Sequence, residues 1–256
     1  MGVQRGHPHR AGRPRRGHRL VRTGGGITYD STPAGEYAEA LLKAEVLHRP
    51  PLDVGLLETL LWRPDSGFPL LERHLARLAA SARFFGTPLD PDAVRTALLA
   101  AVADRAGPSR VRLVVDADGK ADVTVADVPP APRGPVRVAI DTVPVASHDV
   151  FARHKTTQRS VYEAAAARHP GADDVVLVNE RGEVTETTIA TLAARVEGRW
   201  VTPPLSSGCL PGVARAEALA SGRLVEGALT PDDLRRATAL GRLNAVRGWE
   251  EVVLVS

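Results

Sequence analysis

The sequence predicts a mixed α+β protein, with α/β character, built as two lobes. Apolar residues recur at helical spacing in some segments and alternate in others, and the two kinds of segment are interleaved along the chain. A proline-rich stretch, 129–135, has the composition of a connector between the two halves. The chain has 256 residues, 43% of them hydrophobic and 25% charged, which is enough for two lobes with cores of their own.

The first half is expected to begin with a helix and to continue with strands around two more helices. Pro33, followed by alanines, leucines and acids, indicates a helix start, and the prolines at 50 and 51 end that helix. Apolar side chains at three- and four-residue spacing between Leu75 and Phe85 mark the clearest helix of the chain. The expected helices are 33–47, 72–85 and 90–106, and the expected strands are 54–62, 110–115, 123–126 and 136–140.

The second half combines short strands with three short helices. A polar turn at 179–183 follows a buried apolar run and indicates a hairpin-like reversal. Prolines at 211 and 231 suit the first turns of two of the helices. The expected strands are 175–178, 189–196, 200–201, 238–243 and 251–255, and the expected helices are 159–168, 211–221 and 231–236.

The positive charge of the chain is concentrated in one terminal segment. Residues 1–22 contain seven arginines and no acid, which leaves 26 basic and 30 acidic residues in the remainder. A basic tail can bind nucleic acid. This one has no aromatic residue for stacking and no helical period, so we favour a disordered extension, or translation from a misplaced start. Nucleic acid is therefore not an expected partner.

Other composition features exclude whole classes of protein. No stretch approaches the roughly 20 apolar residues that span a bilayer, and no secretory signal is visible, so we expect a cytoplasmic protein and no membrane partner. The single cysteine, Cys209, excludes an internal disulfide framework and a cysteine-built zinc site, and no metal site is expected. Lysine chemistry has few carriers, because the chain contains only Lys43, Lys120 and Lys155.

Three segments of the second half carry residues suited to chemistry. Lys155 precedes a predicted helix in the run His-Lys-Thr-Thr, and Glu186 begins a predicted strand. Gly212 lies at a predicted helix N-terminus, where unpaired N–H groups and the helix dipole favour an anion. Each signal is weak when taken alone, because most lysines and glutamates in such positions are ordinary surface residues.

In this order, the segments resemble the class IV aminotransferase-like, or fold-type IV, pyridoxal-phosphate enzymes. The resemblance covers about 52–256 and implies two lobes, a small N-terminal one and a larger C-terminal one, with pyridoxal 5'-phosphate between them. It implies that Lys155 is the Schiff-base lysine and that Glu186 pairs with the pyridinium nitrogen. Arg77, in Glu-Arg-His-Leu-Ala-Arg-Leu, matches the arginine that binds the cofactor phosphate. The other positions that match phosphate-contacting turns are Val213, Ala214, Asn244 and Ala245.

Within the family, the likeness is greatest to aminodeoxychorismate lyase, which forms p-aminobenzoate and pyruvate in folate biosynthesis. The resemblance assigns Thr59 to substrate orientation or protonation. The small-molecule substrate carries carboxylates, for which Arg112, Arg159 and Arg247, together with Arg110, are candidates. The alternatives are a D-amino-acid or branched-chain aminotransferase, and an inactive fragment. The family is usually homodimeric.

Residues preceding the lyase-like region resemble part of a different enzyme. The run from Gly24 to Ala44, with Glu39 and Lys43, resembles the C-terminal end of a chorismate-utilising aminodeoxychorismate or anthranilate synthase component. A missing synthase domain of a bifunctional p-aminobenzoate synthase would explain this remnant. The predicted organisation is a basic tail (1–22), a synthase remnant with linker (23–51), a small lobe (52–135) and a larger cofactor-binding lobe (136–256).

Overall fold

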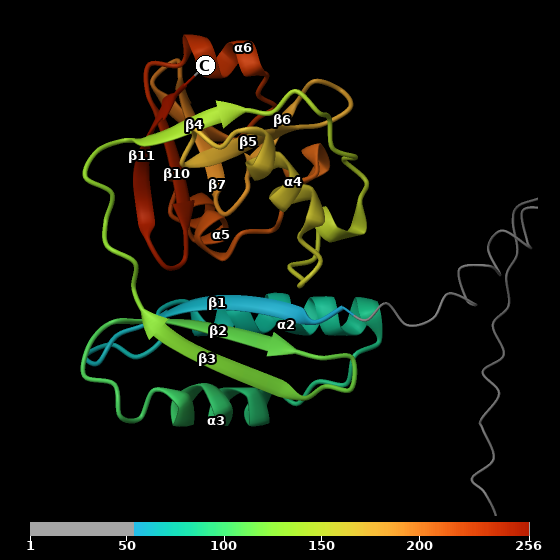
Figure 1. Cartoon of the computed structure of the whole chain (residues 1–256), viewed down its shortest axis with the longest axis vertical. Coiled ribbons are helices and arrows are strands. Elements are labelled where there is room, and N and C mark those ends of the chain that lie inside the picture. The colour runs from blue at the N-terminus through green and yellow to red at the C-terminus, as the bar shows by residue number, and fades with distance from the viewer. Residues whose placement is uncertain (1–53, 256) are drawn as a thin grey trace, which may run out of the picture. The chain divides into compact units, whose positions relative to one another are not determined.

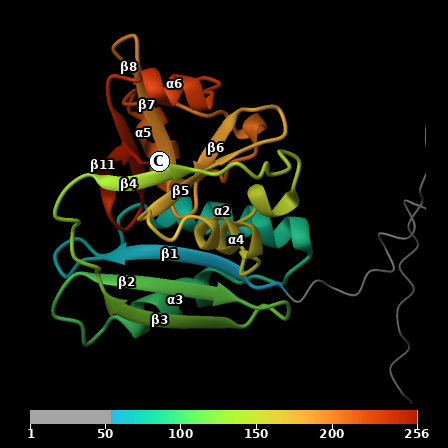
Figure 2. The same ribbon diagram turned by 45° about the horizontal axis from the view of Figure 1, so that its top comes forward.

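A computed structural model describes residues 54–255 of the chain. The predicted helix 33–47, the basic tail, the synthase remnant and Glu39 and Lys43 lie outside the described residues. Within 54–255 the fold is mixed α+β, as the sequence predicts, and it contains two separate sheets (Figures 1 and 2).

The first sheet has three antiparallel strands in the order β1-β2-β3. The alternation in β2 explains its two faces, because Val111, Leu113 and Val115 are buried whereas Arg110 and Arg112 point to the other side. Two helices pack on the apolar face, and their leucines complete a core with it. The bounds are β1 Leu56–Trp62, β2 Ser109–Val115, β3 Ala121–Asp127, α2 Leu71–Phe85 and α3 Pro91–Ala101.

The second sheet has eight strands in the order β6-β5-β4-β11-β10-β7-β8-β9. Strand β4 pairs in parallel with β5 and β11, and β8 with β9, whereas the remaining pairs are antiparallel. The strands are β4 Val136–Ile140, β5 Asp174–Val178, β6 Val184–Thr187, β7 Thr191–Val196, β8 Arg199–Thr202, β9 Val225–Glu226, β10 Leu240–Asn244 and β11 Gly248–Leu254. The helices are α4 Ser160–Arg168, α5 Val213–Ala220 and α6 Pro231–Arg236, with 3-10 turns η1 Val150–Ala152 and η2 Leu205–Ser207.

Three predicted boundaries are wrong for local reasons. Helix α3 ends at Ala101 rather than 106, and beyond it Arg105 donates to Ser109 and pairs with Asp127. The predicted strand 189–196 begins at Thr191, because Thr187 and Ala190 bond each other across a tight turn that closes the separate strand β6. Helix α5 begins at Val213, after a turn that ends at its N-cap, Gly212.

Each sheet has its own hydrophobic core. Leu60, Leu98 and Leu113 are almost fully buried beside the first sheet, and Val138 and Leu192 are buried in the second. Burying one such side chain contributes about 2 kcal/mol. Residues 128–135 join the two sheets. The domain boundaries given above stay predictions.

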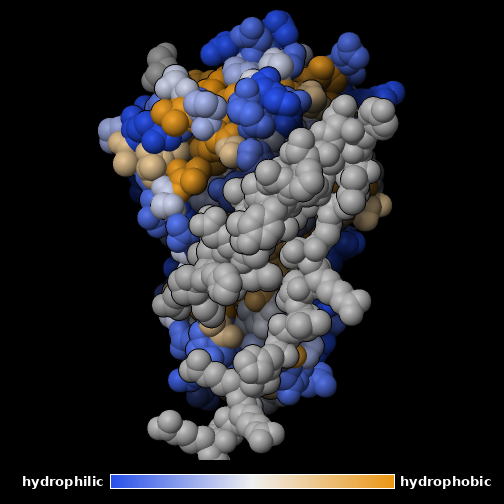
Figure 3. All heavy atoms as spheres, turned by 90° about the vertical axis from the view of Figure 1, so that its right-hand side faces the viewer, coloured by the Kyte–Doolittle hydropathy of each residue, from blue (hydrophilic) through white to orange (hydrophobic). Residues whose placement is uncertain are grey.

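On the face shown in Figure 3, apolar side chains gather in the half that carries the eight-stranded sheet, between charged residues. None of the helices within 54–255 has the length and apolar character needed to cross a bilayer.

Candidate active site

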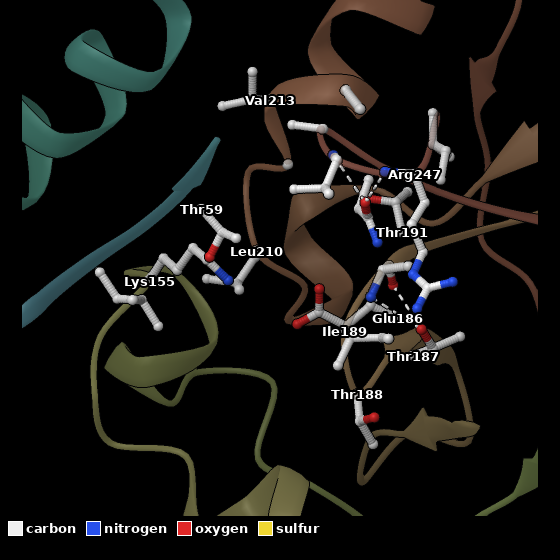
Figure 4. A pocket seen from close by; sticks show the side chains of 18 of the residues that line it. Thr59, Lys155, Glu186, Thr187, Thr188, Ile189, Thr191, Leu210, Val213 and Arg247 are labelled. Carbon is white, nitrogen blue, oxygen red and sulfur yellow. Dashed lines mark hydrogen bonds between the residues drawn. The ribbon is translucent and has the colours of Figure 1, made fainter. Parts of the chain in front are cut away.

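A cavity of about 490 Å³ is lined by residues from both sheets (Figure 4). It collects side chains that lie far apart in the sequence. All the proposed site residues line it, namely Thr59, Arg77, Arg110, Arg112, Lys155, Arg159, Glu186, Val213, Ala214, Asn244, Ala245 and Arg247. The structure thus brings the whole predicted set together, whereas the role of each residue stays a prediction.

Lys155 is fixed at the cavity wall through its backbone. Its carbonyl accepts from the N–H of Leu57 at 2.9 Å, and Thr157 donates to the Gly55 carbonyl at 2.8 Å, so the segment runs along the start of β1. Burial lowers the pKa of Lys155 to about 8, and the positive charges of Arg77 and Arg159 act in the same direction. A neutral, nucleophilic amine is therefore accessible near neutral pH.

Glu186 lies in β6 and is only 5% exposed. Its carboxylate accepts a hydrogen bond from the Tyr162 hydroxyl at 2.8 Å. Burial raises the pKa of Glu186 to about 7, although this bond and the charges of Lys155 and Arg159 favour the ionised form. The group can therefore hold or release a proton near neutral pH, and an opposing cation would keep it ionised.

Tyr162, which orients Glu186, is a residue that the sequence analysis missed. It is buried on α4, and the Arg159 guanidinium lies 4.6 Å from the centre of its ring. Burial and the Glu186 carboxylate raise the pKa of Tyr162, so the hydroxyl stays a donor. The three-residue spacing from Arg159, which places both on one helix face, is the signal that could have found it.

A second missed residue, Glu58, holds the predicted phosphate-binding arginine. Arg77 donates from Nε to Glu58 Oε1 at 2.8 Å and from Nη2 to Oε2 at 2.6 Å. Burial alone would raise the pKa of Glu58, but the charges and hydrogen bonds of Arg77 and His74 outweigh it and hold the pKa at about 2. An acid on the buried face of an apolar strand is a sequence signal for such a pair.

His74 completes this group. Its Nδ1 lies 2.7 Å from Glu58 Oε2, and because the ionised carboxylate can only accept, Nδ1 carries the hydrogen. Its Nε2 is buried and has no hydrogen-bond partner within the described region. Arg77 also donates to the Pro211 carbonyl at 3.1 Å, which places its guanidinium beside the turn that leads into α5.

The N-terminus of α5 lies at one corner of the cavity. Its N-cap, Gly212, offers no side-chain cap, and the first N–H groups of a helix have no partner within the helix. A Cβ at Gly212 would lie 2.7 Å from Thr191 Oγ1, so only glycine allows this approach. Nearby, Asn244 Oδ1 accepts from the N–H groups of Val246 and Arg247 and shapes the turn that contains Ala245.

The substrate-binding candidates differ in what they contact. Arg112 lies opposite Thr59 in the β1–β2 register, and neither Arg112 nor Arg110 forms an ion pair or side-chain hydrogen bond with any residue in 54–255. Arg159 donates to the Thr188 carbonyl at 2.7 Å. Arg247 pairs with Glu250 at 3.3 Å and enters the cavity from the β10–β11 turn (Figure 4).

Three features around one cavity are typical of the fold-type IV class of enzymes: a lysine on a segment bonded to β1, a buried carboxylate and a helix N-terminus. The sequence model of that class, described as amino-transferase class IV, matches residues 55–255. The chain therefore belongs to the class IV aminotransferase family.

Individual relatives carry two kinds of name. A Schizosaccharomyces pombe protein named "Putative aminodeoxychorismate lyase" is 31% identical over 209 residues, which cover 78% of this chain and 89% of the relative. A structure named "Putative amino-acid aminotransferase" from Mesorhizobium loti is 36% identical with a TM-score of 0.76, over 79% of this chain and all of the other. The 4-amino-4-deoxychorismate lyase of Pseudomonas aeruginosa is 26% identical with a TM-score of 0.67, over 78% and 82%.

The cavity residues fit pyridoxal 5'-phosphate, the cofactor of this family. The uncapped α5 N-terminus, close to Arg77, provides the donors that a phosphate needs. Lys155, with its lowered pKa, is the amine suited to an aldehyde, and Glu186 is the buried carboxylate suited to a pyridinium nitrogen.

Proposed function

We propose that this chain is a pyridoxal-phosphate-dependent carbon–oxygen lyase that converts 4-amino-4-deoxychorismate to p-aminobenzoate and pyruvate. The observation that carries the proposal is the charge of the cavity wall. Besides Arg77, four arginines line the cavity, and three of these have no acidic partner within the described residues. That charge suits a substrate with two carboxylates. The similarity to a relative named for this lyase supports the same choice.

In this proposal each chain residue has a distinct task. Arg77 and the N–H groups of Val213 and Ala214, with the Asn244–Ala245 turn, hold the cofactor phosphate. When bound, the cofactor withdraws electrons from the carbon that bears the substrate amine. Glu186 keeps a proton on the ring nitrogen, and the resulting positive charge strengthens that withdrawal. The arginines hold the substrate carboxylates.

Proton transfer belongs to Lys155. Its amine removes the proton from the ring carbon that bears the substrate amine. The carbon–oxygen bond to the enolpyruvyl group then breaks, the six-membered ring becomes aromatic, and the released enolpyruvate takes a proton at carbon from Lys155 or water to give pyruvate. Thr59, beside Lys155 in Figure 4, orients the substrate or protonates the leaving group.

A direct assay tests the proposal. The purified chain, loaded with pyridoxal phosphate, is given aminodeoxychorismate without any 2-oxo acid, and p-aminobenzoate is followed by its fluorescence. We expect product from the parent chain and none from Lys155→Ala. Absence of product from a parent chain that shows bound-cofactor absorbance would overturn the proposal, as would full activity of Lys155→Ala.

A second candidate is a D-amino-acid or branched-chain aminotransferase. The similarity to the Mesorhizobium loti structure favours it. A transaminase needs an amino donor and a 2-oxo-acid acceptor in turn, whereas a lyase needs neither. Product that forms only when both are supplied would select this candidate. A chain that neither binds the cofactor nor forms product would be an inactive fragment.

We further propose that the chain acts as a cytoplasmic homodimer in folate biosynthesis. Apolar side chains such as Val143, Val161 and Leu205 are 40–46% exposed in the described region, and contact with a second copy would cover such surface. Light scattering during gel filtration distinguishes a monomer from a dimer.

A further inference from the structure

A continuous series of polar contacts, most of them buried, links two of the cavity arginines through the second sheet. It begins at Arg159, which donates to the Thr188 carbonyl at 2.7 Å. Thr188 in turn donates from its backbone N–H to Asp174 Oδ1 at 3.1 Å, and its hydroxyl donates to the same oxygen. Asp174 therefore determines the position of the residue that holds Arg159.

The other end of this series of contacts reaches Arg247. Asp174 Oδ2 accepts from Arg242, and Arg242 donates from Nε to Glu250 Oε2 at 2.9 Å. Arg242 and Glu250 are register partners on β10 and β11. The second oxygen of Glu250 lies 3.3 Å from Arg247 Nη1. Charges thus alternate along Asp174, Arg242, Glu250 and Arg247.

The inner residues of this series, Asp174, Arg242 and Glu250, are buried. The side chain of Asp174 is fully buried, that of Arg242 is 5% exposed and that of Glu250 is 7% exposed, whereas Arg247 is 25% exposed at the cavity. Burying ion pairs adds little net stability compared with an apolar core of the same shape. The consequence of the arrangement is geometric, because paired strands and buried charge-assisted hydrogen bonds restrict the positions of its members.

We propose that Asp174, Arg242 and Glu250 form a spacer that fixes the separation of Arg159 and Arg247, so that the cavity selects substrates that carry two carboxylates. This inference rests on the proposed function for the substrate's chemical class. The three spacer residues touch no substrate and act as positioning residues.

Two substitutions test the spacer at its opposite ends. Glu250→Gln removes the charge that faces Arg247. Thr188→Val keeps the side-chain shape but removes the hydroxyl through which Thr188, the residue that accepts from Arg159, is bonded to Asp174. Two variants are the matched controls. Glu251→Gln changes the exposed neighbour of Glu250 in the same strand, and Thr238→Val removes a hydroxyl that donates to the Arg195 carbonyl. Thermal melting confirms that each variant is folded.

Binding is measured by calorimetry on the cofactor-loaded chain with two probes that lack an amine. Chorismate carries one carboxylate on its ring and a second on its enolpyruvyl side chain, and 4-hydroxybenzoate carries a single carboxylate. We expect both spacer variants to weaken chorismate binding on the order of tenfold. Glu250→Gln removes the carboxylate charge that faces Arg242 and Arg247, and Thr188→Val removes a charge-assisted hydrogen bond to Asp174. A single carboxylate engages one arginine, so at most one spacer variant weakens 4-hydroxybenzoate. The controls leave both affinities unchanged.

Three outcomes would overturn the spacer: no chorismate binding by the parent chain, unchanged chorismate affinity in either folded spacer variant, or an equal loss for both probes in both variants. The test is separate from that of the lyase. A chain that binds chorismate with the expected pattern but forms no p-aminobenzoate would refute the lyase proposal and leave the spacer standing.

Discussion

Glu186, in the cavity wall, and Glu58, the partner of Arg77, are buried to a similar extent, yet their pKa values move in opposite directions. Glu58 is 2% exposed and Glu186 is 5% exposed. Glu58 is held ionised by a bidentate guanidinium and an imidazole, whereas among residues 54–255 the only side chain that donates to Glu186 is the neutral Tyr162 hydroxyl. Burial therefore decides the protonation of Glu186, and ion pairing decides that of Glu58.

Glu58→Gln is expected to destabilise the chain in a pH-dependent way. The folded-state pKa of Glu58, about 2, lies below its ordinary value of 4.5, so its contribution is present above pH 4.5 and is lost as pH falls toward 2. At pH 7 we expect the free energy of unfolding to fall by about 3 kcal/mol, since Arg77 and His74 lose their partner. Urea unfolding at several pH values should show parent and variant converging in acid. The exposed Glu251→Gln is the control, and a constant difference at all pH values would contradict this account.

Glu186→Gln is expected to have the opposite effect on stability. The folded-state pKa of about 7 lies above the ordinary 4.5, so the stability that Glu186 contributes is full below pH 4.5 and is lost as pH rises through 7. In the cofactor-free chain at pH 8, the variant should unfold with a free energy up to about 3 kcal/mol higher than the parent. The lyase assay should show reduced activity. A lower melting temperature of the variant at pH 8 would refute the assignment.

At the scale of elements, the site depends on how closely the N-terminus of α5 approaches β7. Gly212 makes that approach possible, because a side chain there would collide with Thr191. The phosphate-binding role proposed for α5 uses backbone groups, so its geometry depends on packing rather than on any functional side chain.

Gly212→Ala is expected to weaken cofactor binding about tenfold, because the helix N-terminus must shift away from Thr191. The change in Kd for pyridoxal phosphate is measured by equilibrium titration of the cofactor-free chain. Gly171→Ala is the matched control, since a Cβ there meets nothing within 4 Å. Equal cofactor affinity in the two variants would show that cofactor binding does not need the close approach of Gly212 to Thr191.

At the scale of the whole molecule, the cavity needs both sheets but only part of the chain. Its lining residues run from Leu57 to Arg247, and the family match covers 55–255. A variant that begins at residue 52 is therefore expected to bind pyridoxal phosphate and to form p-aminobenzoate at the parent rate. Cofactor titration and the fluorescence assay check this, and loss of either property would assign a role to residues 1–51.

Much of the fold could be predicted from local pattern. The helical period placed α2 within one residue of its observed start, and prolines marked the start of α6. The split between β6 and β7 could not be predicted in this way. It depends on a hydroxyl-to-backbone bond between Thr187 and Ala190, which hydrophobic periodicity does not reveal.

The sequence by itself determined the fold class and a set of candidate residues, all of which line the cavity. Lys155 and Glu186 could be proposed without coordinates, because lysine is rare in this chain and the short motifs around both residues match those of the family. Only the tertiary structure decided which groups touch. Glu58 meets Arg77 across 19 positions, and Asp174 meets Arg242 across 68. Such contacts follow from strand order and packing, and through burial and charge they set the pKa values and arginine positions on which the proposed chemistry depends.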